Sequence, residues 1–300
     1  MSNLKRMLFY AFAFVMVISL IGCGSGAAET NAGTGENNGS GKIYEWKMAS
    51  IYNDPAAASK FNSMGVAQQK FVDLVKEKTN GRVVIKPYYN SVLGGDQELF
   101  QKVRRGEIEV FYGTLLASVD KRFGALSIPF MFNNFDEVEK ANDPNEGPLF
   151  KLTEQWLGEH DVQLLGVGPG VFRGFANSKH PVKQVSDLND LKVRTYQDPV
   201  VGIFWGANSN AVQLPFSEVY TALQTKTVDG LEFPATSVLG RKIDEITKFY
   251  TNIDWQWSSG ANIIVGNKYW NELPDDLKAL VKEASIEAMR IGNASKALHY

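Results

Sequence analysis

Residues 94–113, GGDQELFQKVRRGEIEVFYG, decide the fold class, because a short helix and a strand follow one another here with clear boundaries. The apolar positions that share one helix face are Leu99, Phe100 and Val103. Asp96 is placed to cap the start of this helix, and Gly106 predicts its end before a strand at 107–113. A strand at 83–89 precedes the helix, and a strand–helix–strand order of this length predicts parallel pairing and an α/β fold.

The same alternation of strands and helices continues on both sides of this stretch. Further strands are predicted at 44–51, 162–170, 171–177, 191–196, 227–233 and 262–267. Further helices are predicted at 56–78, 146–160, 198–206 and 217–225, and a long one opens at Pro274. The sequence shows no repeat of fixed period and no glycine-rich phosphate loop of either standard spacing.

The first 23 residues read as a targeting segment and not as part of the fold. Lys5 and Arg6 precede an uncharged run at 7–21 that is short for a membrane span and fits the apolar region of a secretory signal. Cys23, the only cysteine, follows small and aliphatic residues. Its placement resembles the lipobox of bacterial lipoproteins, in which the thiol is lipidated and the cysteine becomes the new N-terminus. An ordinary signal peptide cut near Ala27-Ala28 and an uncleaved anchor are the alternatives.

Composition separates a tether from a globular body. Residues 24–42 consist largely of Gly, Ser, Asn, Thr and Ala, which cannot offset the entropy of ordering, so a flexible tether is predicted. The stretch from Ile43 to Tyr300 is long enough for one large domain or two lobes. The chain has 31 basic and 33 acidic residues without a basic stripe, so nucleic acid is not expected as a partner.

No catalytic or metal-binding pattern stands out in the sequence. His160, His180 and His299 lie far apart and have no acidic residues at ligand spacing, so neither a metal nor a cofactor is predicted. Glu107 and Glu109 alternate in a predicted strand, which is typical of a solvated face. A hydrolase that used two distant carboxylates would escape such a search, so an enzyme remains an alternative.

Residues 208–234, NSNAVQLPFSEVYTALQTKTVDGLEFP, are the most specific part of the chain. They resemble the signature of the substrate-binding proteins of tripartite ATP-independent periplasmic (TRAP) transporters. Three further stretches agree in order with this family: residues 71–114, the IPFMF loop at 128–132, and residues 173–194 with their two arginines. The resemblance covers roughly residues 44–290.

The resemblance implies an α/β protein with a two-lobed periplasmic-binding-protein-like fold, crossing hinge strands and a long C-terminal helix. Lobe I would comprise residues 43–169 plus about 258–300, and lobe II residues 170–257. In this family the arginine of the DLKVR strand meets the ligand carboxylate, and here that residue is Arg194. The strand pattern alone favours the alternative, an Arg194 on a solvated strand face. Arg173 is expected to support Arg194, with a structural salt bridge at the lobe junction as the alternative. A guanidinium presents paired N–H donors that match a carboxylate and stays charged at any relevant pH.

The resemblance also implies aromatic and acidic residues at the pocket. Phe216 falls at a position whose ring lines the site in the family, with core packing as its alternative. Glu232 is expected to border the site together with Phe233. Many relatives carry asparagine where this chain has Phe233, and an aromatic residue there resembles the branch that binds 2-oxo acids. The sequence therefore leaves the ligand open between a 2-oxo acid, a C4-dicarboxylate, a sugar acid and other acids.

Further ligand-binding candidates come from strand ends, where open α/β sheets place their ligands. Tyr112 and Thr114 end the strand at 107–113, and Asn53 follows the first strand. Trp255 and Trp257 could flank the cleft, although burial in the core is at least as good an interpretation.

The combined interpretation is a lipid-anchored, extracytoplasmic solute receptor without catalytic residues. Its expected partners are a small organic acid, the membrane subunits of a TRAP permease, and the lipid bilayer through Cys23. Receptors for an ATP-driven importer or a sensor, which could use the same body, and an extracellular enzyme acting on an organic acid are the alternatives.

Overall fold

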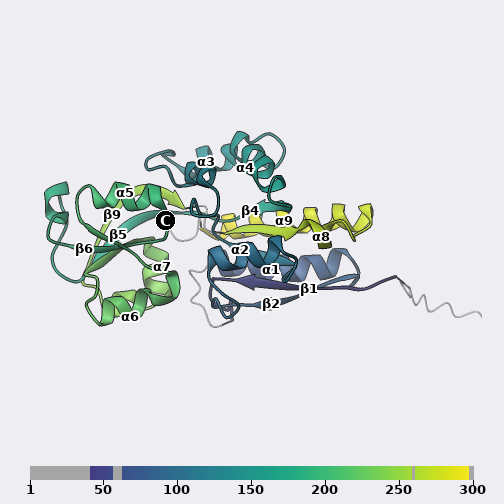
Figure 1. The fold of residues 1–300 in the computed structure, drawn as a ribbon, viewed down its shortest axis with the longest axis horizontal. Helices are drawn as coiled ribbons and strands as arrows, with labels where there is room; N and C mark the ends of the chain where they lie inside the picture. The colour runs from purple at the N-terminus through teal and green to yellow at the C-terminus, as the bar shows by residue number, and fades with distance from the viewer. Residues whose placement is uncertain (1–40, 57–62, 259–260, 297–300) are drawn as a thin grey trace, which may run out of the picture. The chain divides into compact units, whose positions relative to one another are not determined.

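The computed structural model describes residues 41–56, 63–258 and 261–296 (Figure 1). The predicted signal at 1–23, including Cys23, and nearly all of the predicted tether at 24–42 lie outside the described residues. Within the described ranges, no helix combines the length and the apolar character that crossing a bilayer requires.

Ten strands and nine α-helices alternate along the described part of the chain. The strands are β1 (Tyr44–Ser50), β2 (Val83–Tyr88), β3 (Val110–Gly113), β4 (Val162–Val167), β5 (Val171–Asn177), β6 (Lys192–Thr195), β7 (Asn210–Gln213), β8 (Gly230–Phe233), β9 (Phe249–Ser258) and β10 (Asn262–Gly266). The α-helices are α1 (Ser63–Lys78), α2 (Asp96–Arg104), α3 (Phe135–Ala141), α4 (Pro148–Gly158), α5 (Pro199–Gly206), α6 (Val219–Gln224), α7 (Ala235–Gly240), α8 (Asn267–Trp270) and α9 (Asp275–Lys296). The 3₁₀-helices are η1 (Lys121–Ser127), η2 (Val185–Leu188), η3 (Phe216–Glu218) and η4 (Ile243–Glu245).

The strands form two sheets of five strands each. In the first sheet the order is β2-β1-β3-β10-β4, in which β1 runs parallel to β2 and β3, and β10 runs antiparallel to β3 and β4. In the second the order is β7-β6-β8-β5-β9, in which β6 runs parallel to β7 and β8, and β5 runs antiparallel to β8 and β9. The predicted α/β class is confirmed. Lobe I here denotes the first sheet with its helices, and lobe II the second.

Alternation along β3 explains how lobe I is covered on both faces. Val110 and Tyr112 pack with α1 and α9 on one face, and Phe111 packs with α2 on the other. Because both faces of β3 are buried, successive residues of the strand are all apolar, as is typical of parallel strands covered by helices on both faces. The predicted strand at 107–113 is shorter in the structure, where β3 spans Val110–Gly113. The expectation that Glu109 lies on a solvated face is wrong: it is 6% exposed, and its carboxylate accepts a hydrogen bond from the Lys47 amide.

The second sheet is likewise covered on both faces by helices, α5 on one side and α6 on the other (Figure 1). Phe175 packs toward Trp205 of α5, while its neighbour Ala176 packs toward the α6 side. Trp255 belongs to the α5-side core and is fully buried, and Trp257 is buried against Phe132 and Phe172. Both tryptophans are thus core residues, the alternative that the sequence favoured at least as strongly.

Two short segments carry the chain between the sheets. One leads from β4 to β5 through Gly168-Pro169-Gly170, and the other from β9 to β10. A side chain at Gly168 would collide with the backbone of Ala261, and one at Gly170 with the ring of Trp257. The two glycines therefore allow the segment at 168–170 to lie close to Ala261 and to Trp257 of β9.

Candidate functional site

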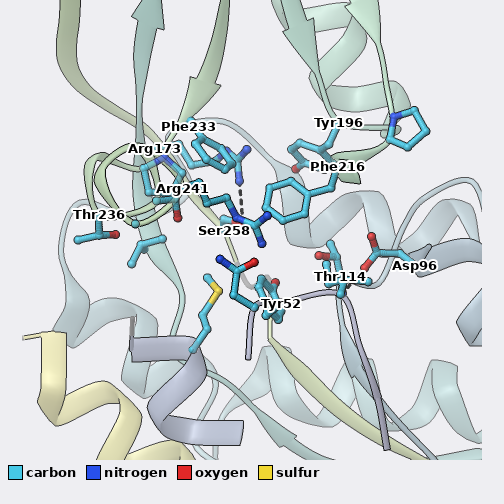
Figure 2. A pocket seen from close by; sticks show the side chains of 18 of the residues that line it. Tyr52, Asp96, Thr114, Arg173, Tyr196, Phe216, Phe233, Thr236, Arg241 and Ser258 are labelled. Carbon is cyan, nitrogen blue, oxygen red and sulfur yellow. Dashed lines mark hydrogen bonds between the residues drawn. The ribbon is translucent and has the colours of Figure 1, made fainter. Parts of the chain in front are cut away.

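A cavity of about 1040 Å³, counted to its open mouth, lies between residues of the two lobes. Lobe I contributes Asn53 and Thr114, and lobe II contributes Arg173, Arg194 and Phe216. Figure 2 shows Thr114, Arg173 and Phe216 around this space. Phe233 also lines it. Six of the eight ligand-binding residues predicted from the sequence therefore line one cavity, although their contact with a ligand stays a prediction.

Arg194 reaches the cavity from β6 and is 1% exposed. Its Nε and Nη2 both donate to the carbonyl oxygen of Leu214, at 3.1 and 2.8 Å. That edge of the guanidinium is thus occupied. Nη1 has no hydrogen-bond acceptor among the described residues, and the nearest acid, Glu232, lies 3.9 Å away at Oε1. The part of Arg194 available to a carboxylate is consequently its end, Nη1 with the second Nη2 proton.

Arg173, on β5, is held on every side by protein groups. Its Nε donates to Oε2 of Glu232, Nη2 donates to the Glu232 carbonyl oxygen at 3.0 Å, and Nη1 donates to Ser258 Oγ at 3.2 Å. Burial acts to lower the pKa of Arg173, but the charge of Glu232 and other neighbours outweighs it, and the net shift is upward. Arg173 is therefore a fixed, permanently charged group at the back of the cavity.

Glu232 is fully buried and does not line the cavity. Its Oε1 accepts a hydrogen bond from the Tyr196 amide at 3.3 Å, in addition to its pair with Arg173. The prediction that Glu232 borders the ligand is corrected in this respect: the side chain is turned toward the two arginines because a buried carboxylate needs paired charges and donors. Its role is to fix Arg173 in place.

The structure also corrects the prediction that Tyr112 lines the ligand site. Its side chain points away from the cavity into the core between β3 and α1, is fully buried, and donates from its hydroxyl to the Met64 carbonyl oxygen at 3.0 Å. The alternation along β3 forces this orientation, since Phe111 takes the opposite face. Thr114, just beyond the strand, reaches the cavity instead.

Aromatic rings form much of the lobe II wall. The rings of Phe216 and Phe233 lie 5.7 Å apart, and the guanidinium carbon of Arg173 lies 5.7 Å from the Phe233 ring centroid. Tyr196, not predicted from the sequence, also lines the cavity and donates from its hydroxyl to Ser127 Oγ at 3.1 Å. Burial raises the pKa of Tyr196, so its hydroxyl stays protonated. This wall therefore offers a ligand an apolar surface next to the arginine side chains.

The lobe I wall carries Asp96, which the sequence analysis predicted as a helix cap. Asp96 is the first residue of α2, and its Oδ1 accepts from the Thr114 amide at 2.7 Å, while Gly95 takes the capping position without a side-chain bond. Burial raises the pKa of Asp96 to about 6, against hydrogen bonds from Thr114 and the charge of Arg194. Tyr52, beside it, has a pKa raised by burial and by Asp96. The predicted cap is thus a cavity residue (Figure 2).

A third arginine lines the cavity and was missed by sequence reasoning. Arg241 directly follows α7, and its guanidinium carbon lies 3.7 Å from the centroid of the Phe216 ring. Its signal in the sequence is a lone basic residue beside Lys242, which looks like a solvated pair. Only the fold turns one of the two inward.

The chemistry of the site is that of anion binding. Three arginines converge on a cavity whose other walls are aromatic rings and short polar side chains. In the described part of the chain, no group of three or more His, Cys, Asp or Glu side chains could hold a metal ion. Two α/β lobes joined by crossing segments around a cationic cavity define a solute-binding protein of the periplasmic type.

Comparison with known proteins identifies the family. Residues 56–296 match the family model of bacterial extracellular solute-binding protein, family 7. The chain belongs to this family, the substrate-binding proteins of TRAP transporters, as the resemblance implied. Its relatives are receptors and not enzymes.

Individual relatives agree along most of the chain. The chain is 31% identical over 229 residues, covering 75% of this chain and 69% of the other, to the 2,3-diketo-L-gulonate-binding periplasmic protein YiaO of Escherichia coli (strain K12). It is similar to the sugar acid binding protein DctPAm from Advenella mimigardefordensis in complex with galactonate, at 25% identity, a TM-score of 0.75 and coverage of 86% and 81% of the two chains. A TRAP periplasmic solute binding protein from Sulfurospirillum deleyianum with bound succinate gives the same identity, TM-score and coverage.

Proposed function

We propose that this protein is the extracytoplasmic receptor of a TRAP transporter and delivers a small organic acid to the membrane permease. The observation that carries the proposal is the end of Arg194, a buried cation whose Nη1 has no hydrogen-bond acceptor among the described residues and which lines the cavity. A carboxylate supplies both the charge and the two acceptor atoms that such a group requires.

The relatives support the class of ligand and leave its identity open. The name of one relative refers to a diketo sugar acid, and two similar structures hold galactonate and succinate. All three compounds are small organic acids. Galactonate has one carboxylate and succinate has two, so the likeness alone does not decide the number of charges on the ligand of this chain.

The proposed mechanism is closure of the two lobes around the bound acid. Residues 43–169 with about 258–300 would move as one lobe and 170–257 as the other, with the segment at 168–170 in the hinge. Arg194 and Arg173 hold the acid on lobe II, and the polar groups of lobe I complete the site. A ligand that contacts both walls binds the closed state better than the open one and shifts the population toward it.

We further propose that the receptor is anchored to the membrane through Cys23. The basic start, the short apolar run and the cysteine at its end support a lipoprotein signal. Metabolic labelling of the expressed full chain with a radioactive fatty acid should mark the wild-type protein and not the Cys23→Ser variant. Labelling of both, or of neither with release of a soluble protein, would contradict the anchor.

The test of the receptor function is a thermal-shift screen of the purified protein against small organic acids. A ligand that binds the native state raises the melting temperature, and at 100 times its Kd it adds about 2.7 kcal/mol of stability. Arg194→Ala should abolish the shift while the unfolding transition stays cooperative. If no acid raises the melting temperature, or if the Ala variant binds within a few-fold of wild type, the assignment is wrong. Incubation of each hit with the protein, followed by product analysis, would reveal turnover if the protein were an enzyme.

A further inference from the structure

Arg241 has a position in the cavity that the proposed function does not yet use. It directly follows α7, and its guanidinium lies against the ring of Phe216 (Figure 2). Arg194 lines the same cavity. Tyr52 and Thr114 of lobe I line the same space (Figure 2). Arg241 is thus placed where a ligand between the lobes would meet it.

The guanidinium of Arg241 has no acceptor among the described residues. It forms neither a hydrogen bond nor an ion pair there, whereas Arg173 has three acceptors and Lys242, the next residue, pairs with Glu245 at 3.7 Å. Its guanidinium carbon lies 3.7 Å from the centroid of the Phe216 ring, and none of its five N–H donors has an acceptor among the described residues. The N–H donors of a half-buried cation require acceptors. A ligand in the cavity that Arg241 lines could supply them.

The side chains around the cavity also carry an excess of positive charge. Glu232 pairs with Arg173 and lies 3.9 Å from Nη1 of Arg194, and Asp96 is the one acid among the described residues that line the cavity, so three arginines face two carboxyl groups. Burial and the nearby charge of Arg194 lower the pKa of Arg241 to about 10, so both groups remain cations at neutral pH. One carboxylate bound at Arg194 would leave the second cation without a counter-charge.

The aromatic wall connects Arg241 with Arg173, whose partner Glu232 also lies 3.9 Å from Nη1 of Arg194. The Phe233 ring lies beside Arg173, the Phe216 ring lies beside Arg241, and the two ring centroids are 5.7 Å apart. A ligand with charged groups at both ends and a short apolar or hydroxylated middle fits this order of groups along the wall.

We propose that Arg241 binds a second anionic group of the ligand, so that this receptor selects small acids with two negatively charged ends, of which short dicarboxylates are the simplest. This inference rests on the proposed function, because it assumes that the first acid group is bound at Arg194. Arg241 would then determine the preference of the receptor for acids with two negative charges over acids with one.

The test compares ligand pairs that differ only in the second charge. The probes are malonate, succinate and glutarate and the monoamide of each, titrated calorimetrically into the wild type and the variants Arg241→Gln and Arg241→Lys. Lys242→Gln is the matched control, since it removes one positive charge from the neighbouring, exposed residue. Cooperative thermal unfolding of each variant establishes that it is folded.

The wild type should bind the best diacid at least about tenfold more tightly than its monoamide, as expected for a charge-assisted hydrogen bond. Arg241→Gln should reduce this preference to about threefold or less while monoamide affinity changes little, and Arg241→Lys should keep part of it. Lys242→Gln should leave all affinities unchanged. A preference that survives Arg241→Gln, or an equal loss for both ligands, would overturn the inference. So would binding of single-charge acids without any diacid, which would leave the receptor function intact; failure of every acid would remove both proposals.

Discussion

Replacement of Arg194 by lysine tests whether the shape of the cation matters as well as its charge. In the structure the guanidinium performs two tasks at once: Nε and Nη2 hold the Leu214 carbonyl oxygen, and the end of the group faces the cavity. A lysine ammonium is a single nitrogen on a shorter reach and cannot serve both positions. We therefore expect Arg194→Lys to fold and to bind the acid weakly.

The size of the loss follows from the bonds that the end of Arg194 can make. Two parallel bonds to a carboxylate would be reduced to at most one, and a hydrogen bond between charged groups contributes about 1.5–3 kcal/mol. The Kd should accordingly rise by about 10- to 150-fold. The loss should be present for any acid that binds, because the first carboxylate is common to all of them.

Isothermal titration of the best acid from the thermal-shift screen measures this directly. Lys192→Gln is the control, since Lys192 lies two residues earlier on β6 with an exposed side chain, and its loss also removes one positive charge. A Kd for Arg194→Lys within about threefold of wild type would refute the reasoning, because it would show that net charge alone holds the acid.

Three further perturbations probe the lobe I wall, the buried ion pair and the core. Burial raises the pKa of Asp96 to about 6, so above that pH the carboxylate is ionised and repels an anionic ligand. The affinity of the wild type for the acid should therefore fall as the pH rises through about 6, and the affinity of Asp96→Asn should not. Ligand titrations below and above that pH measure this, and a wild-type profile in the variant would contradict the assignment. Glu232→Gln leaves Arg173 buried without its counter-charge and should lower the free energy of unfolding by about 3–5 kcal/mol in denaturant titrations, an unchanged midpoint being the opposing result. Phe71→Ala on α1 removes a fully buried ring and should cost about 3–5 kcal/mol in the same assay, whereas Lys70→Ala at the exposed neighbouring position should stay within about 0.5 kcal/mol.

The fold could be predicted from sequence wherever a local pattern carried the information. Apolar spacing and the glycine at 106 placed α2 to within two residues of its end, and the order of strands and helices gave the α/β class. The short strand β7, with the sequence NAVQ, and helix α7, directly after Pro234, had no comparable signal. Both depend on pairing or packing with residues that are distant in sequence, which a local pattern does not contain.

The family resemblance and the strand ends pointed to six residues that line the cavity, but the sequence did not predict the direction of every side chain. The strand pattern alone favoured a solvated Arg194, because Lys192 and Arg194 alternate with Val193. In the structure only Lys192 is exposed, since helices cover both faces of the second sheet. Tyr112 was taken for a cavity residue because it ends a strand, but the side to which its ring points depends on the packing of the whole lobe.

The two walls of the cavity differ in chemistry, and this difference gives them separate tasks. Lobe II carries all three arginines and the two phenylalanine rings, so it supplies the charge and the apolar contact that hold an acid, and capture should begin there. The lobe I wall offers Thr114, the Tyr52 hydroxyl and the carboxyl of Asp96, which recognise donors and hydroxyl groups and are repelled by a bare anion when Asp96 is ionised. Closure therefore adds affinity only for ligands that present more than charge to lobe I. Substitution of Arg194 on lobe II should then change affinity for every acid, whereas substitutions on lobe I should change mainly the ranking among acids and the population of the closed state.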